Sequence, residues 1–255
     1  ILDDLVKVFP DIPPVPTRLP VDFSVLRNDR LSFQIALSTL ILPGRRPGMR
    51  FVQLEVDSPL AASITLRSVE NVPVRYPSHA GTPDGIYLRK TPGLYPDVLM
   101  PVQHNVFSMH DGIWRAIWVD VDIPEDTAPC EYPLTIRLKD PQSGTVFAVL
   151  DLPVTVLSPI LPPQTFPRTE WFHADCLADA YHTQVFSEKH WQLLEAYISQ
   201  AVKRGINMIL TPQFTPPLDT AVGWERPTTQ LVEVFLENGQ YRFDFSLLDR
   251  WVRLC

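Results

Sequence analysis

The sequence predicts a multidomain chain of the β plus α/β class, in which an antiparallel β-sandwich precedes the opening of a β/α layer fold. Short runs of alternating apolar and polar residues fill residues 1–158. Prolines then crowd residues 159–167, and after them the apolar spacing changes to three or four residues. The 255 residues are 45% hydrophobic and 20% charged, which excludes a disordered chain.

The first segment carries many short strands with no helical pattern between them. Alternation buries one face of a strand and exposes the other, and turn residues such as Pro47-Gly48, Asp111-Gly112 and Ser143-Gly144 separate the runs. This pattern is typical of an antiparallel sandwich. The clearest runs are 31–37, 51–56, 63–69, 116–122, 132–138 and 146–156.

The second segment alternates strand and helix signals. We expect a short strand at 169–173, a polar loop to Phe186, and a helix capped by Ser187 with an apolar face of Trp191, Leu194, Ile198 and Val202. Gly205 would end this helix.

An apolar run over 206–210 predicts a strand covered on both faces. A long loop at 211–230 then leads to a hairpin around Asn238-Gly239, and Ser246 is expected to cap a final helix. The 89 residues from Pro167 to Cys255 suffice for about two β/α units, whereas a whole β/α barrel needs about 250 residues.

Composition and charge exclude several function classes. The net charge of −7 argues against nucleic acid as a partner, and no apolar run approaches the roughly 18 residues that span a membrane. Three widely spaced cysteines predict free thiols, which favours a cytoplasmic location, although the missing initiator Met leaves room for a signal peptide already removed.

Polar and aromatic residues gather just after the predicted strand at 169–173, where β/α folds place functional groups. Trp171, His173 and Asp175 predict a sugar pocket, in which the Trp would stack on a pyranose and the carboxylate would accept hydroxyl hydrogens. The alternative interpretation puts Trp171 in the core and the polar groups on loop backbone. A metal site built from His173, Asp175, Cys176, Asp179 and His182 matches no standard ligand spacing, so we expect no metal and no cofactor.

The long loop at 211–230 supplies a second set of candidates. Asp219 and Glu225 are expected to contact substrate, with Arg226 beside them, because loops of this length in compact domains usually carry function. The alternative interpretation is a turn cap at Asp219 and a surface pair of Glu225 with Arg226.

Several of these segments resemble a known family. Residues 169–179, 207–212 and 215–220 resemble the start of the catalytic domain of glycoside hydrolase family 123, and residues 92–99 and 118–127 resemble its N-terminal sandwich. Cys130 stands where that family leads us to expect glycine. The resemblance implies a sandwich at 1–158, a Pro-rich linker at 159–167, and at 168–255 the N-terminal part of a truncated (β/α)8 catalytic barrel.

The resemblance also implies a chemistry. Such β-N-acetylgalactosaminidase-like enzymes use substrate assistance: the 2-acetamido oxygen attacks the anomeric carbon while an adjacent Asp-Glu pair orients the amide and protonates the leaving oxygen. No Asp-Glu dipeptide lies after Pro167, so the pair is expected beyond Cys255.

The sequence therefore predicts the N-terminal portion of a glycoside hydrolase for a terminal N-acetylhexosamine, inactive by itself. The chain would contribute substrate contacts and no catalytic group, and the residues expected to make these contacts are Trp171, His173, Asp175, Asp219 and Glu225. The alternative is a non-catalytic carbohydrate-binding or interaction module. We also expect the open barrel edge to promote self-association, which light scattering would reveal.

Overall fold

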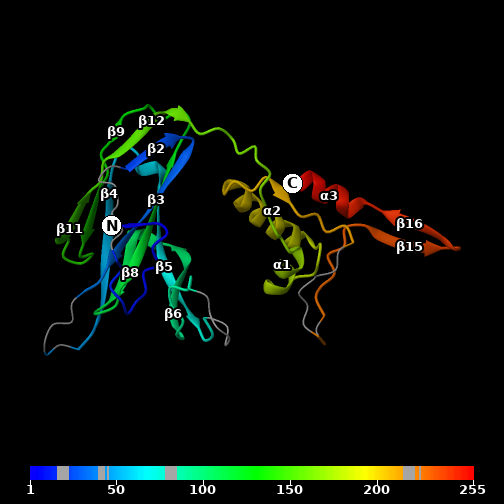
Figure 1. The fold of residues 1–255 in the computed structure, drawn as a ribbon, viewed down its shortest axis with the longest axis horizontal. Coiled ribbons are helices and arrows are strands. Elements are labelled where there is room, and N and C mark those ends of the chain that lie inside the picture. The colour runs from blue at the N-terminus through cyan, green and yellow to red at the C-terminus, as the bar shows by residue number, and fades with distance from the viewer. Residues whose placement is uncertain (16–22, 40–43, 45, 78–84, 215–221, 224) are drawn as a thin grey trace. The chain divides into compact units, whose positions relative to one another are not determined.

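The chain folds into two compact units, Ile1–Pro162 and Pro163–Cys255 (Figure 1). The computed structural model describes residues 1–15, 23–39, 44, 46–77, 85–214, 222–223 and 225–255. Most of its strands pair antiparallel and few helices accompany them, which confirms the predicted β-rich class.

The first unit is a sandwich of β-sheets. Its strands and 3-10 turns are β1 (Leu2–Asp3), β2 (Phe23–Arg27), β3 (Asp29–Leu37), β4 (Met49–Asp57), η1 (Ala61–Ser63), β5 (Ile64–Val74), β6 (Gly93–Pro101), η2 (Gln103–Asn105), β7 (Val106–His110), β8 (Arg115–Ile123), β9 (Glu131–Tyr132), β10 (Thr135–Lys139), β11 (Val146–Asp151) and β12 (Val154–Ile160). The sheet orders are β1-β3-β8-β5-β6, β11-β10-β4-β7 and β2-β12-β9. One pair, β2 with β12, is parallel and so departs from the antiparallel prediction.

Alternation along the strands builds the core of this unit. Phe33 and Ile35 on β3 face inward, as do Ile117, Val119 and Val121 on β8, and all five are at most 2% exposed. Phe23 stacks on Phe33 with ring centroids 5.0 Å apart. Alternating polar residues of the same strands lie on the opposite face of the sheet, where Asp120 accepts hydrogen bonds from Ser32, Arg67 and Trp118.

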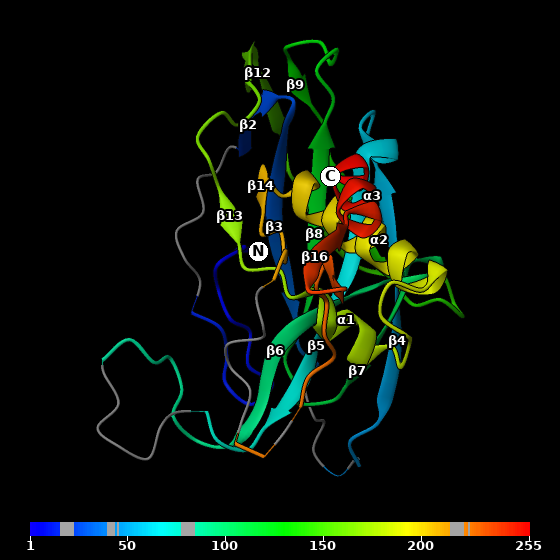
Figure 2. The same ribbon diagram turned by 90° about the vertical axis from the view of Figure 1, so that its right-hand side faces the viewer.

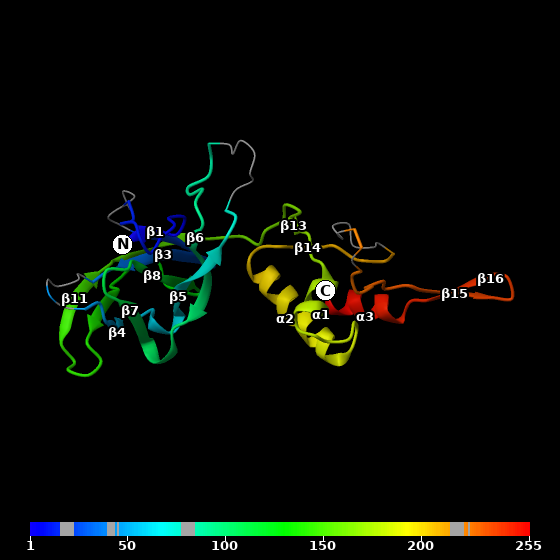
Figure 3. The same ribbon diagram turned by 90° about the horizontal axis from the view of Figure 1, so that it is seen from below.

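The second unit contains β13 (Thr169–Glu170), α1 (Ala174–Ala180), α2 (Glu188–Lys203), β14 (Met208–Ile209), β15 (Glu233–Glu237), β16 (Gln240–Asp244) and α3 (Ser246–Leu254). Its helices lie on one side of the β13–β14 pair (Figures 2 and 3). Trp191, Leu194, Ile198, Leu231 and Trp251 form its core. No described helix is long and apolar enough to cross a membrane.

Two features of α2 were predicted well. The Ser187 side chain accepts the His190 N–H at 3.3 Å, and Gly205 follows the helix with a φ of 83°, as a C′ glycine does. Val202 is 57% exposed, so the predicted apolar face extends only to Ile198.

Other local predictions for this unit were wrong. The expected polar loop contains α1. A helix this short is unstable by itself, and burial of Ala174, Leu177 and Ala178 against α2 stabilises it. The strand expected at 206–210 is only Met208–Ile209, and Met208 is 48% exposed. Ser246 does not cap α3; instead Asp244 Oδ1 accepts the Ser246 N–H at 2.8 Å.

A buried carboxylate ties β4 to the turn after β7. Asp111, 9% exposed, accepts hydrogen bonds from Arg50 Nε (2.7 Å), Thr39 Oγ1 (2.7 Å) and the Gly48 N–H (3.1 Å). These donors, above all Arg50, lower the pKa of Asp111 from 3.8 to about 2.

The depressed pKa predicts an acid-labile first unit. A carboxyl whose folded pKa lies below its unfolded value stabilises the fold above the unfolded pKa, so the contribution is lost as pH falls from about 4 to about 2. We expect Asp111→Asn to flatten the decline of the urea midpoint over this range. Asp126→Asn, which alters an exposed turn carboxylate, should retain the decline; equal slopes for Asp111→Asn and the unmodified chain would contradict the assignment.

Candidate functional site

Two parallel strands define the edge at which the candidate residues emerge. β13 pairs with β14 in the register Thr169↔Met208 and Glu170↔Ile209. Because the strands run in the same direction, the segments after Glu170 and after Ile209 leave the sheet at the same end. Carboxyl ends of parallel strands are where β/α folds place their binding groups.

The first candidate segment exposes an aromatic ring at this edge. Trp171 is 68% exposed, which contradicts the alternative that placed it in the core. The half-buried His173 lies edge-on to it, with ring centroids 6.1 Å apart and an interplanar angle of 67°. An exposed indole beside an imidazole can stack on the apolar face of a sugar and offer its hydroxyl groups a hydrogen-bond partner.

Asp175 has a different environment. Its side chain is 4% exposed and its Oδ2 accepts a hydrogen bond from Arg226 Nε at 2.6 Å. Arg226 Nη2 also lies 3.1 Å from the Sγ of the exposed Cys176. The pair therefore joins Arg226 to α1.

The second candidate segment is closed by a backbone hydrogen bond. The Leu231 N–H donates to the Pro212 carbonyl at 3.1 Å, and Leu231 is fully buried. The two ends of the long loop therefore meet just beyond β14. Glu225 is exposed next to Arg226 in the chain, whereas Asp219 lies outside the described residues.

His190 is a site-positioning residue that sequence reasoning missed. It is fully buried, its Nδ1 accepts the Phe186 N–H at 2.9 Å, and its Nε2 donates to the Ala174 carbonyl at 2.9 Å when the neutral ring carries its proton there. The sequence does hold a signal for His190, because this residue lies three positions after the Ser187 cap, where a polar side chain faces the start of the helix.

The structure thus brings Trp171 to His173, and Asp175 to Arg226. The described residues contain no group of three or more His, Cys, Asp or Glu side chains that could hold a metal ion. The arrangement offers an aromatic surface and hydrogen-bonding groups, which suits binding of a polyhydroxylated ligand.

The buried ion pair yields a stability prediction. Arg226→Met would leave the Asp175 carboxylate buried without its cation, which typically costs about 3 kcal/mol. We expect that loss in denaturant unfolding of the second unit, and a double variant with Asp175→Asn should lose less than the sum of the single changes. Glu188→Gln breaks only the exposed pair with Arg250 and should cost less than about 1 kcal/mol; an equal cost for both single changes would show that the Asp175 pair is no more than a surface contact.

Comparison with known proteins points to one family. Residues 171–255 match the family model for the catalytic domain of glycoside hydrolase 123, which confirms the resemblance for that part of the chain. No curated protein matches the chain.

Solved structures support the same fold. A family 123 glycoside hydrolase from Clostridium perfringens, solved in work on glycolipid glycan hydrolysis, superposes with a TM-score of 0.71 at 16% identity over 91% of this chain. This chain covers 40% of that enzyme's length. The N-terminal domain of PorA superposes with a TM-score of only 0.27 at 9% identity, over 59% of this chain and 96% of its own length, which does not show a shared fold.

Proposed function

We propose that this chain is the N-terminal portion of a glycoside hydrolase that cleaves a terminal 2-acetamido sugar by substrate-assisted, retaining chemistry. The match of residues 171–255 to a glycoside hydrolase 123 catalytic domain carries the proposal. The similar enzyme from Clostridium perfringens is much longer than this chain, which accords with an incomplete (β/α)8 barrel here.

Within this proposal the chain binds substrate and supplies no acid or nucleophile. Trp171 would stack on the sugar ring, and His173 and Glu225 would contact its hydroxyl groups. Asp175, which was also predicted to contact substrate, is buried and paired with Arg226. The adjacent Asp-Glu pair of such enzymes, one orienting the acetamido group and one protonating the aglycone, would come from sequence beyond Cys255.

A binding measurement tests the role of Trp171. We expect the chain to bind N-acetylgalactosamine in calorimetry and to leave a nitrophenyl N-acetylgalactosaminide intact. Trp171→Ala should weaken binding about fivefold, since one aromatic stacking contact contributes about 1 kcal/mol.

Tyr76→Ala is the control, because Tyr76 is 83% exposed and lies in the first unit. Hydrolysis by the chain at enzyme-like rates would overturn the assignment of the catalytic pair to sequence beyond Cys255. Unchanged affinity in Trp171→Ala would remove this residue from the substrate site.

A cavity in the sandwich favours a second candidate, a non-catalytic carbohydrate-binding module. Its volume is about 740 Å³, and its lining includes Phe51, Phe147, Arg50 and Gln142. Phe51 and Phe147 are 47% and 54% exposed, so both rings are accessible to a ligand. Such a mixture of aromatic and polar groups is typical of ligand sites.

Glycan binding by single variants distinguishes the two candidate functions. If the sandwich binds glycans, Phe147→Ala should weaken binding about tenfold while Val149→Ala, a 50% exposed neighbour outside the cavity lining, leaves it unchanged. If binding depends on Trp171 instead, the module hypothesis fails. The open edge beside β13 and β14 is also proposed to promote self-association.

A further inference from the structure

The hairpin of β15 and β16 has one face made only of apolar side chains. Val234 pairs with Phe243 across the two strands and Leu236 pairs with Tyr241, so these four side chains lie on the same face. Phe245 continues the alternation, and its ring centroid lies 6.2 Å from that of Phe243. We call these five residues the apolar face of the hairpin.

The apolar face is well exposed. Its exposed fractions run from 41% at Val234 to 70% at Tyr241. The hairpin extends away from α1 and α2 (Figures 1 and 3). Because a fully exposed aromatic side chain presents about 150–250 Å², these fractions correspond to roughly 500 Å² of apolar surface on one copy of the chain. A contiguous apolar patch of this size is characteristic of an interaction site.

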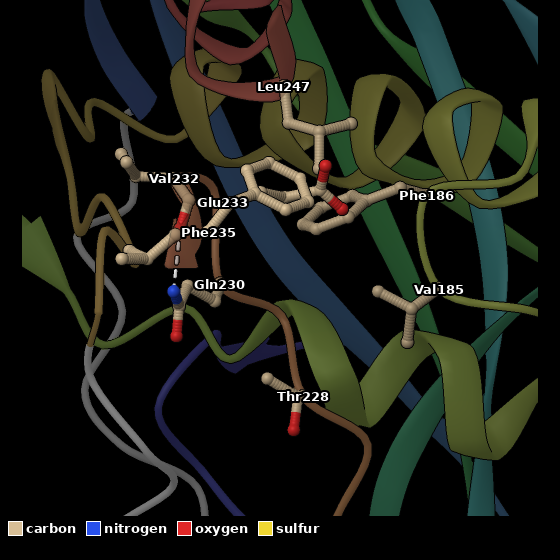
Figure 4. Close-up of a pocket in the computed structure, with 9 residues that line it drawn as sticks. Val185, Phe186, Thr228, Gln230, Val232, Glu233, Phe235 and Leu247 are labelled. Carbon is tan, nitrogen blue, oxygen red and sulfur yellow. Dashed lines mark hydrogen bonds between the residues drawn. The ribbon is translucent and has the colours of Figure 1, made fainter. Parts of the chain in front are cut away.

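The opposite face of the hairpin has a different character. Its residues are Glu233, Phe235, Glu237, Gln240, Arg242 and Asp244. Glu233 and Phe235 line a cavity of about 450 Å³ with Phe186 and Leu247 (Figure 4), so this face borders the rest of the second unit. The described lining of that cavity includes one residue of the apolar face, Val234. Within the part of the chain that the structure describes, the apolar face is therefore the uncovered side of the hairpin.

The charge of the hairpin disfavours a lipid surface as the partner. Glu233, Glu237 and Asp244 outnumber the single cation Arg242, and the whole chain has a net charge of −7. Segments that bind membrane surfaces through an apolar face usually carry Lys and Arg beside it. An uncharged protein surface fits better, and the apolar face of a second copy of this chain is such a surface.

Pairing of two copies through strand edges is also disfavoured. If two copies of β15 paired antiparallel along their whole length, Glu233 of each copy would lie opposite Glu237 of the other. Like charges opposite one another destabilise a sheet, and charged residues protect strand edges from such pairing. Packing face to face avoids this repulsion, because the charged side chains then lie on the outer sides of the two hairpins.

The area of the apolar face suits a weak dimer. Two apolar faces packed about a two-fold axis would bury about 1,000 Å² in total, which is the lower limit for a specific interface. We infer that the chain forms a symmetric dimer through the apolar faces of two hairpins, with a dissociation constant on the order of 10 µM. The inference is independent of the proposed function, because no residue of the apolar face is expected to contact substrate.

Sedimentation velocity tests the dimer with the whole 255-residue chain, over concentrations from about 1 to about 100 µM. We expect a reversible change from monomer to dimer across this range. Leu236→Glu and Phe243→Glu each place a charge in the interface, and each should raise the dissociation constant at least about tenfold. Hydrogen exchange of the unmodified chain should show protection of residues 233–245 that increases with concentration.

Gln240→Glu is the matched control. It introduces the same charge into the same hairpin, at an exposed position on the opposite face. This variant should dimerise as the unmodified chain does, while near-ultraviolet circular dichroism confirms that all three variants fold.

Each other outcome overturns the inference. A chain that stays monomeric at the highest concentration does so directly, and binding of that monomer to phosphatidylcholine vesicles through Leu236 would identify a lipid-binding surface instead. A dimer that Leu236→Glu and Phe243→Glu leave intact belongs to another surface, such as the edge beside β13 and β14. Equal weakening by Gln240→Glu would show general charge repulsion in place of a contact at the apolar face.

Discussion

His190, near the start of α2, is fully buried, and its two ring nitrogens join α2 to the loop before it and to the start of α1. Its backbone N–H donates to the Ser187 side chain that caps the helix. β13 and β14 alone give this part of the unit little rigidity, because they pair over only two residues each. Helix packing and the His190 contacts therefore fix where Trp171, His173 and Asp175 leave the sheet.

The sandwich is stabilised differently. The inward-facing residues of its longer strands alternate with polar ones and form one continuous apolar core. One buried polar side chain there is well matched: Gln34 Nε2 donates to the carbonyls of Asp3, Asp4 and Val6, and so holds the N-terminal segment against the sheet. Such pairing meets the hydrogen-bond requirement of buried polar atoms.

Buried and exposed polar groups are separated within the second unit. Asp175 and Arg226 are largely buried and paired with each other, whereas Trp171, Glu225 and Glu233 are exposed. Among the residues that the structure describes, the buried indole N–H of Trp251 has no hydrogen-bond partner, and the residues of β15 and β16 are exposed on both faces.

The sequence alone determined the elements whose signals are local. Period-two alternation marks β3, β4 and β8, a 3.6-residue period with Ser187 marks α2, and Asn238-Gly239 marks the hairpin, where both residues have a positive φ as a type I′ turn requires. Trp171 and His173 could likewise be proposed from their position after a strand.

Only the tertiary structure decided the rest, because it depends on contacts between distant residues. A seven-residue helix such as α1 is unstable in isolation and forms by burial against α2. The partner of Asp175 lies 51 residues away, and one cavity of the second unit is lined by residues between Val185 and Leu247. No local pattern encodes such proximity, since packing of the whole unit brings these residues together.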